Sequence, residues 1–116
     1  RHFRRALAVS ERHLGPDDPG NAHEWRGLGQ CALAEGRPRD ALAHFTRALE
    51  LARAGGSSST VLFARFHVAE ARWALGERAA ARAEAKAVHA ALPAEGIRVE
   101  PHHRAELERW LATHPL

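Results

Sequence analysis

The stretch from Trp25 to Arg53 constrains the fold most, because it carries two apolar stripes at helical spacing with a turn signal between them. Successive residues of an α-helix are about 100° apart, so positions three and four residues apart share a face. The first stripe contains Trp25, Leu28, Gly29 and Ala32, and the second contains Ala41, Leu42, Phe45, Ala48 and Leu49. The two stripes predict two amphipathic helices with facing apolar sides.

The turn between these helices is marked by Gly36 and Pro38. Glycine commonly follows the last residue of a helix, and proline is suited to the first helical position. Gly29 and Ala32 are small, so we expect them to face Ala41 and to let the two backbones approach closely. This stretch is therefore predicted to form a tight helical hairpin.

These residues also stand at the positions of a known repeat consensus. The pattern W-x2-L-G-x2-A, a turn glycine, and A-x3-F-x2-A resembles the tetratricopeptide repeat. The matching residues are Trp25, Leu28, Gly29, Ala41, Phe45 and Ala48, whereas Ala32 replaces the usual aromatic and Arg53 the usual terminal proline. The resemblance implies an all-α fold of antiparallel helical hairpins wound into a superhelix, with about six helices.

The residues before this hairpin match its second helix. Phe3 and Leu7 precede Phe45 and Leu49 by one and the same offset, which is 42 positions. We therefore interpret residues 1–14 as the second helix of a truncated preceding repeat, and expect the chain to be a fragment of a longer protein. The connector L-G-P-D-D-P resembles that of the kinesin-light-chain type of repeat. Asn21 with Glu24 predicts a capping box.

The hairpin belongs to a repeat that we predict over residues 22–54. A second, diverged copy follows it. Gly76 repeats Gly36 at an offset of 40 positions, which pairs Val68 with Leu28 but puts Arg65 in place of the tryptophan. We predict a loop over 55–60, helices over 61–75 and 78–92 in a repeat spanning 58–92, and a capping helix over 101–114. The segments V-A-E-A-R-W-A-L-G and R-A-E-L-E-R-W-L-A-T-H-P resemble the C-terminal repeat tails of bacterial serine/threonine kinases, which implies a signalling or scaffolding role.

Composition excludes several classes of protein. No apolar run approaches the about 18 residues of a membrane span. The single cysteine, Cys31, excludes an intrachain disulfide framework and favours a reducing, cytoplasmic setting. The formal net charge is only +3 because arginine and glutamate alternate along the helices, which disfavours binding of nucleic acid.

No catalytic constellation is recognisable, so we expect no enzymatic activity and no cofactor. The nine histidines suggest a metal site, and His102 with Glu106 has helical spacing. Adjacent histidines, however, point about 100° apart on a helix, so we interpret His102 and His103 as solvent-exposed and expect no bound metal.

The most promising functional surface is one side of the first helix of each of the two predicted repeats. In the family that the chain resembles, this side lines a concave groove that holds partner peptides. The candidate partner-binding residues are His23, Arg26, Gln30, Leu33, Phe66, Glu70 and Trp73. Two alternatives remain open at this stage. Phe66 and Trp73 could instead pack under the terminal cap, and the face formed by Phe3, Ala6 and Val9 could mediate homodimerisation.

Overall fold

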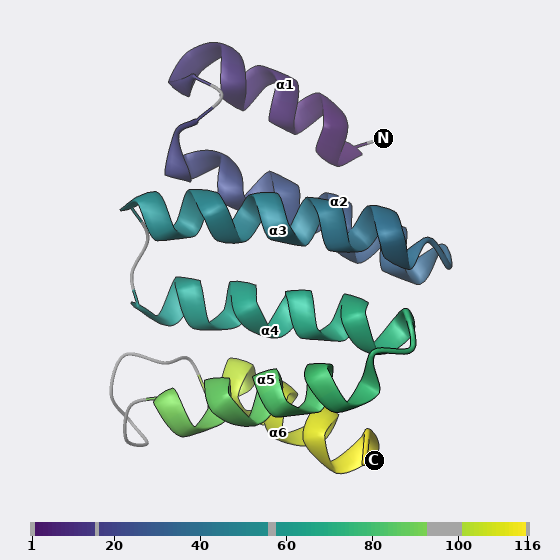
Figure 1. Ribbon diagram of the computed structural model, residues 1–116. Coiled ribbons are helices and arrows are strands. Elements are labelled where there is room, and N and C mark those ends of the chain that lie inside the picture. The colour runs from purple at the N-terminus through teal and green to yellow at the C-terminus, as the bar shows by residue number, and fades with distance from the viewer. Residues whose placement is uncertain (1, 16, 56–57, 93–100, 116) are drawn as a thin grey trace.

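The structure, a computed structural model, describes residues 2–15, 17–55, 58–92 and 101–115, without the side chains of residues 2, 3, 19, 58, 59 and 101–103. The elements are α1 (His2–Leu14), the 3-10 helix η1 (Pro19–Asn21), α2 (Ala22–Ala34), α3 (Pro38–Gly55), α4 (Ser58–Ala74), α5 (Arg78–Ala91) and α6 (Pro101–Thr113). The helices stack in chain order, from α1 at one end to α5 and α6 at the other (Figure 1). The described residues contain no strand, so the all-α prediction is confirmed.

The two helical hairpins, α2 with α3 and α4 with α5, turn in the same way. Gly36 and Gly76 have φ angles of 76° and 93°. This is a left-handed conformation, which glycine adopts at little steric cost. In each turn the residue after the glycine donates to the carbonyl five residues back, and the glycine donates to the carbonyl three residues back. The distances are 2.8 and 3.1 Å at Gly36 and 2.9 and 3.0 Å at Gly76. Both turns are therefore Schellman motifs.

The loop predicted over 55–60 is wrong at both ends. Helix α3 runs to Gly55 and α4 already begins at Ser58, so only residues 56 and 57 lie between them, outside the described residues. Serine and threonine are tolerated at the start of a helix because their side chains can satisfy backbone groups there. A Ser/Thr run is therefore as typical of a helix start as of a loop.

The core of the first hairpin depends on a glycine beneath a phenylalanine ring. Phe45 is 1% exposed, and a Cβ atom at Gly29 would lie 2.5 Å from two of its ring carbons. The atoms that come closest to Gly29 therefore belong to Phe45 and not, as expected from the sequence, to Ala41. Ala41 is itself fully buried, in the same cluster as Ala32.

In the second hairpin, both residues that correspond to this glycine–phenylalanine contact are different. At the repeat offset of 40 positions, Ala69 stands at the place of Gly29 and Ala85 at the place of Phe45, and both are fully buried. Where the ring is absent, a methyl group is accommodated at the glycine position. The internal comparison supports the steric reason for Gly29.

Helix α4 belongs to two hydrophobic clusters. Its Ala64, Val68 and Ala71 pack with α2 and α3, whereas its Phe63 and Phe66 pack with α5 and α6. Its charged residues Arg65, Glu70 and Arg72 remain partly exposed between these two apolar faces. Helix α4 therefore joins the two hairpins, with α3 on one side and α5 on the other.

Replacing Gly29 with alanine tests the glycine–ring contact. The methyl group favours the helix by about 1 kcal/mol, but overpacking against a buried ring costs about 1–3 kcal/mol. We expect Gly29→Ala to lower the free energy of unfolding by up to about 2 kcal/mol in urea denaturation. In a Phe45→Leu background the same change should be neutral or stabilising. Additive effects in this double-mutant cycle would contradict the contact.

Candidate partner-binding surface

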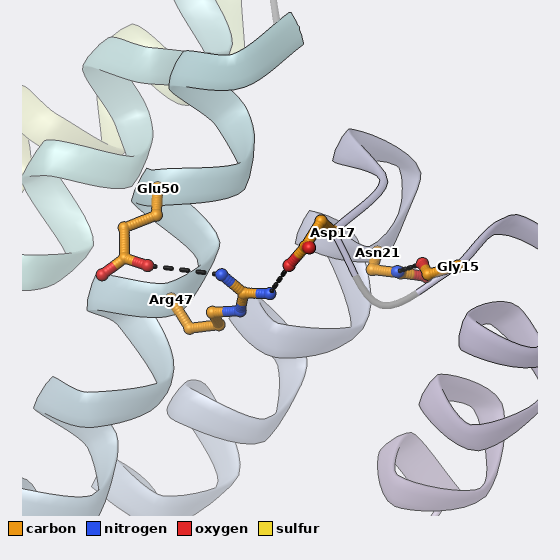
Figure 2. Close-up of polar contacts among 5 residues, drawn as sticks. All are labelled: Gly15, Asp17, Asn21, Arg47 and Glu50. Atoms are coloured by element: carbon orange, nitrogen blue, oxygen red, sulfur yellow. Dashed lines mark hydrogen bonds and ion pairs between the residues drawn. The ribbon is translucent and has the colours of Figure 1, made fainter.

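The start of α2 is positioned by a buried asparagine in the connector from α1. Asn21 is fully buried; its Nδ2 donates to the Gly15 carbonyl at 2.7 Å, and its Oδ1 accepts from Ser10 Oγ. The first of these contacts is drawn in Figure 2. The predicted capping box is therefore wrong: the Asn21 side chain makes no capping hydrogen bond because it faces α1 and the connector.

The same connector is tied to α3 by an ion pair. Asp17 Oδ1 lies 2.8 Å from Arg47 Nη2, and Arg47 Nη1 also reaches Glu50 Oε2 at 3.3 Å (Figure 2). The Asp17 side chain is 88% exposed. Solvent therefore screens this pair, and it adds little to stability.

The candidate partner-binding residues form a predicted strip that runs over α2 and α4. Helix α2 carries its polar half. His23 and Gln30 are exposed and Arg26 is partly exposed, each about one helical turn from the next. Arg26 Nη2 donates to His23 Nδ1 at 2.8 Å. A guanidinium group has five N–H donors, so others remain available to solvent or a ligand. Leu33 is partly buried against the core of the first hairpin.

Helix α4 uses its half of the predicted strip mostly for packing. Phe66 is 1% exposed and meets Trp110 of α6 edge-on, with ring centroids 5.7 Å apart. Trp73 is partly buried. The centroid of its ring lies 5.5 Å from the centroid of the Trp110 ring and 5.4 Å from Cζ of Arg78. These two aromatic residues thus pack under the terminal helix, which is the alternative that the sequence leaves open. Glu70 is partly exposed, and its Oε1 lies 2.8 Å from Nδ1 of His67.

The terminal helix is held by contacts that the sequence does not reveal. Arg82 of α5 donates to the carbonyls of Leu111 and His114, at 2.8 and 3.0 Å. These bonds satisfy free groups at the end of α6. The His114 ring stacks on Trp110 with a centroid distance of 4.3 Å. The apolar spacing of α6 indicates a cap, but no sequence spacing connects Arg82 to residues about 30 positions away.

One histidine of the first hairpin has a lowered pKa. His44 of α3 lies against Trp25, with ring centroids 5.5 Å apart. Its pKa is lowered, first by burial and then by the positive charges of Arg4 and Arg37, although Asp40 acts in the opposite direction. The neutral imidazole is therefore the form that the folded protein prefers.

The described residues contain no group of three or more side chains that could hold a metal ion. The side chains of His102 and His103 lie outside that description. Cys31 is exposed on α2. None of the helices searched is both long and apolar enough to cross a membrane, over the part of the chain that the structure describes.

Comparison with known families agrees with the repeat geometry. Residues 1–54 match the family model of the tetratricopeptide repeat. This match supports a protein of the tetratricopeptide-repeat type. It ends within α3, so the second hairpin and α6 extend the stack beyond it. The comparisons with curated proteins and with solved structures find no match.

Replacing Asn21 tests the connector of this tetratricopeptide-type unit. Asn21→Ala leaves the Gly15 carbonyl and the Ser10 hydroxyl without a buried partner, which should lower the free energy of unfolding by about 2–3 kcal/mol. Asp17→Ala removes an exposed ion pair of the same connector and should cost less than about 1 kcal/mol. Urea denaturation of both variants gives the comparison, and equal losses would contradict the assignment.

The lowered pKa of His44 predicts a loss of stability in acid. As the pH falls below about 6.5, the unfolded chain takes up a proton at His44 before the folded protein does, so the free energy of unfolding decreases. The decrease between pH 7 and pH 5 should be smaller in His44→Gln. In a nuclear magnetic resonance titration, Arg4→Gln should raise the pKa of His44 only partly, because burial is the larger cause. An unchanged value would rule out the influence of Arg4.

Proposed function

We propose that this chain is a protein–protein interaction module without catalytic activity of its own. It binds a peptide, or a segment of a partner protein, in a groove along the first helices of its hairpins. The support is the match of residues 1–54 to the tetratricopeptide repeat, a repeat that generally mediates protein–protein interaction. No cofactor takes part in this function.

The observation that carries the proposal is the accessible polar strip on α2, which consists of His23, Arg26 and Gln30. These side chains stand on successive turns of a helix whose other side is buried against α3. A surface on a rigid helix is formed before the ligand arrives, so binding has a small ordering cost. The strip is rich in donors, because a guanidinium group donates only and accepts no hydrogen bond.

The chemistry of the strip favours a partner segment that supplies acceptors. Backbone carbonyls of an extended peptide, or an aspartate or glutamate side chain, would pair with Arg26 and Gln30. Glu70 on α4 limits how much negative charge the ligand can carry further along the groove. The ligand is thus a mostly extended segment with one acidic group near Arg26.

The setting we propose is a larger bacterial regulatory protein in the cytoplasm, in which this module serves as a docking or scaffolding part. The resemblance of two segments to the C-terminal repeat tails of bacterial kinases supports this setting. Binding of nucleic acid is disfavoured by the pairing of helix arginines with carboxylates. Such pairs join Arg37 to Asp40 at 3.1 Å and Arg65 to Glu84 at 2.6 Å.

The proposal is tested by selecting ligands for the immobilised 116-residue chain from a peptide library and measuring affinity by calorimetry. Arg26→Ala should weaken binding of the selected peptides about 5- to 30-fold, the loss typical of an interface anchor. Arg39→Ala on α3, also an exposed arginine, is the matched control and should leave the affinity unchanged. Failure to select any peptide, or equal losses in both variants, would refute the groove assignment.

A further inference from the structure

Helix α6 packs on a surface formed by both helices of the second hairpin. Four side chains that meet it define what we call the α6 contact surface, and these are Phe66 and Trp73 of α4 with Arg82 and His89 of α5. The ring of Trp110 lies edge-on to both aromatic rings, at interplanar angles of 83° to Phe66 and 79° to Trp73. Edge-to-face pairs add attraction beyond the apolar area that they bury. The aromatic half of this surface therefore fits one large ring.

The polar half of the α6 contact surface fits the end of a helix and one carboxylate. Arg82 donates to the carbonyls of Leu111 and His114, near the end of α6. Every α-helix leaves its last carbonyls without a partner inside the helix. His89 Nε2 lies 2.8 Å from Oε2 of Glu108. The surface therefore offers groups both to the main chain and to an acidic side chain of the helix that covers it.

The first hairpin leaves the corresponding side of its first helix more accessible. Phe66 and Trp73 follow Arg26 and Leu33 by 40 positions, which is the offset between the two repeats. Arg26 is partly exposed, whereas Phe66 is 1% exposed and lies against Trp110. Helix α6 thus occupies, on the second hairpin, the side that the first hairpin presents to solvent.

Few side chains hold α6 in this position. Between residues 104 and 113, only Leu107 and Trp110 are buried. The outer side of the helix carries charged residues, among them Glu106 and Arg109, which are exposed. Segments with few buried apolar contacts open at the lowest cost in free energy. We therefore expect α6 to open before α4 and α5 do.

We propose that α6 is an internal occupant of a helix-binding surface, and that a helix of a partner protein replaces it there. The occupant seen in the structure gives the chemistry of that helix. It carries a leucine and a tryptophan three positions apart, as in Leu107 and Trp110, with an acidic residue between them and its end at Arg82. While α6 is bound the surface is closed, so α6 inhibits this association. The proposal does not rest on the groove function, because no residue of α2 belongs to the α6 contact surface.

Replacement of α6 is a competition between a tethered helix and a free one. A helix attached through a short segment is present at an effective concentration of about 1 mM. For a free helix with a dissociation constant of about 10 µM, the tethered copy therefore raises the apparent dissociation constant about 100-fold. Weakening the tethered helix removes this competition.

The competition is tested on the 116-residue chain with a labelled synthetic peptide of residues 101–116 as the probe, by fluorescence anisotropy. In a Trp110→Ala chain the tethered helix loses its anchoring ring, whereas the peptide keeps its own. This chain should bind the peptide about 100-fold more tightly than the unchanged chain does. Arg109→Ala replaces an exposed residue of the same helix and is the matched control, which should bind as weakly as the unchanged chain.

Two further variants keep the test decisive. A peptide that itself carries Trp110→Ala should not bind the Trp110→Ala chain. Leu111→Ala in the chain is a smaller change at a partly buried position, and it should give an intermediate affinity even if circular dichroism shows Trp110→Ala to be unfolded. Equal affinity of the unchanged chain and of a folded variant for the probe would overturn the proposal.

Nuclear magnetic resonance locates the bound peptide. In an isotope-labelled Trp110→Ala chain, Trp25 and Trp73 are the two residues that give indole N–H signals, because the peptide is unlabelled. Binding at the α6 contact surface should shift the signal of Trp73 and leave that of Trp25 unchanged. A shift of Trp25 alone, or binding that shifts neither signal, overturns the assignment of this surface.

Discussion

The packing of helices α2, α3 and α4 depends on the position of the Phe45 ring. The ring lies where a side chain at residue 29 would have to be, and its other neighbour is His67 of α4, with centroids 5.3 Å apart. One side chain of α3 is therefore in contact with both α2 and α4. Because protein interiors are packed as densely as organic crystals, such a ring leaves no room for adjustment. The Phe45 ring thus contributes to the packing between the two hairpins, together with the other residues of its cluster.

The second hairpin fills its core with different residues, and these include aromatic residues of the surface predicted from the sequence. Without a ring at residue 85, the core is filled by Phe66 from α4 and by Leu107 and Trp110 from α6. Phe66 and Trp73, which the sequence predicts to line a groove, thus pack against the terminal helix. The consequence is that the accessible donors lie on α2, whereas α4 contributes Glu70 and the partly buried Trp73.

The sequence predicts the helices well because periodicity, glycine and proline are local signals. Pro38 and Pro101 begin helices as expected, and Gly36 ends one. Periodicity gives the face of a helix but not the residue that it meets, so the partner of Gly29 could not be read from it. The choice between groove and cap for Phe66 depends on contacts with α6, far away in the chain. The prediction for Asn21 is wrong because its side chain has two competing sets of partners, and only the tertiary structure decides between them.

The two ends of the stack differ, and the difference follows from how stacked hairpins are stabilised. Each hairpin is held mainly by its neighbours. At one end α6 supplies the cap. Arg82 donates to the carbonyls of Leu111 and His114 there, and Trp110 lies edge-on to Phe66. At the other end Val9 stays half exposed and Glu24 keeps an unpaired oxygen. Within the described residues, a partly exposed apolar side chain and an unsatisfied carboxylate oxygen therefore lie in one pocket at α1.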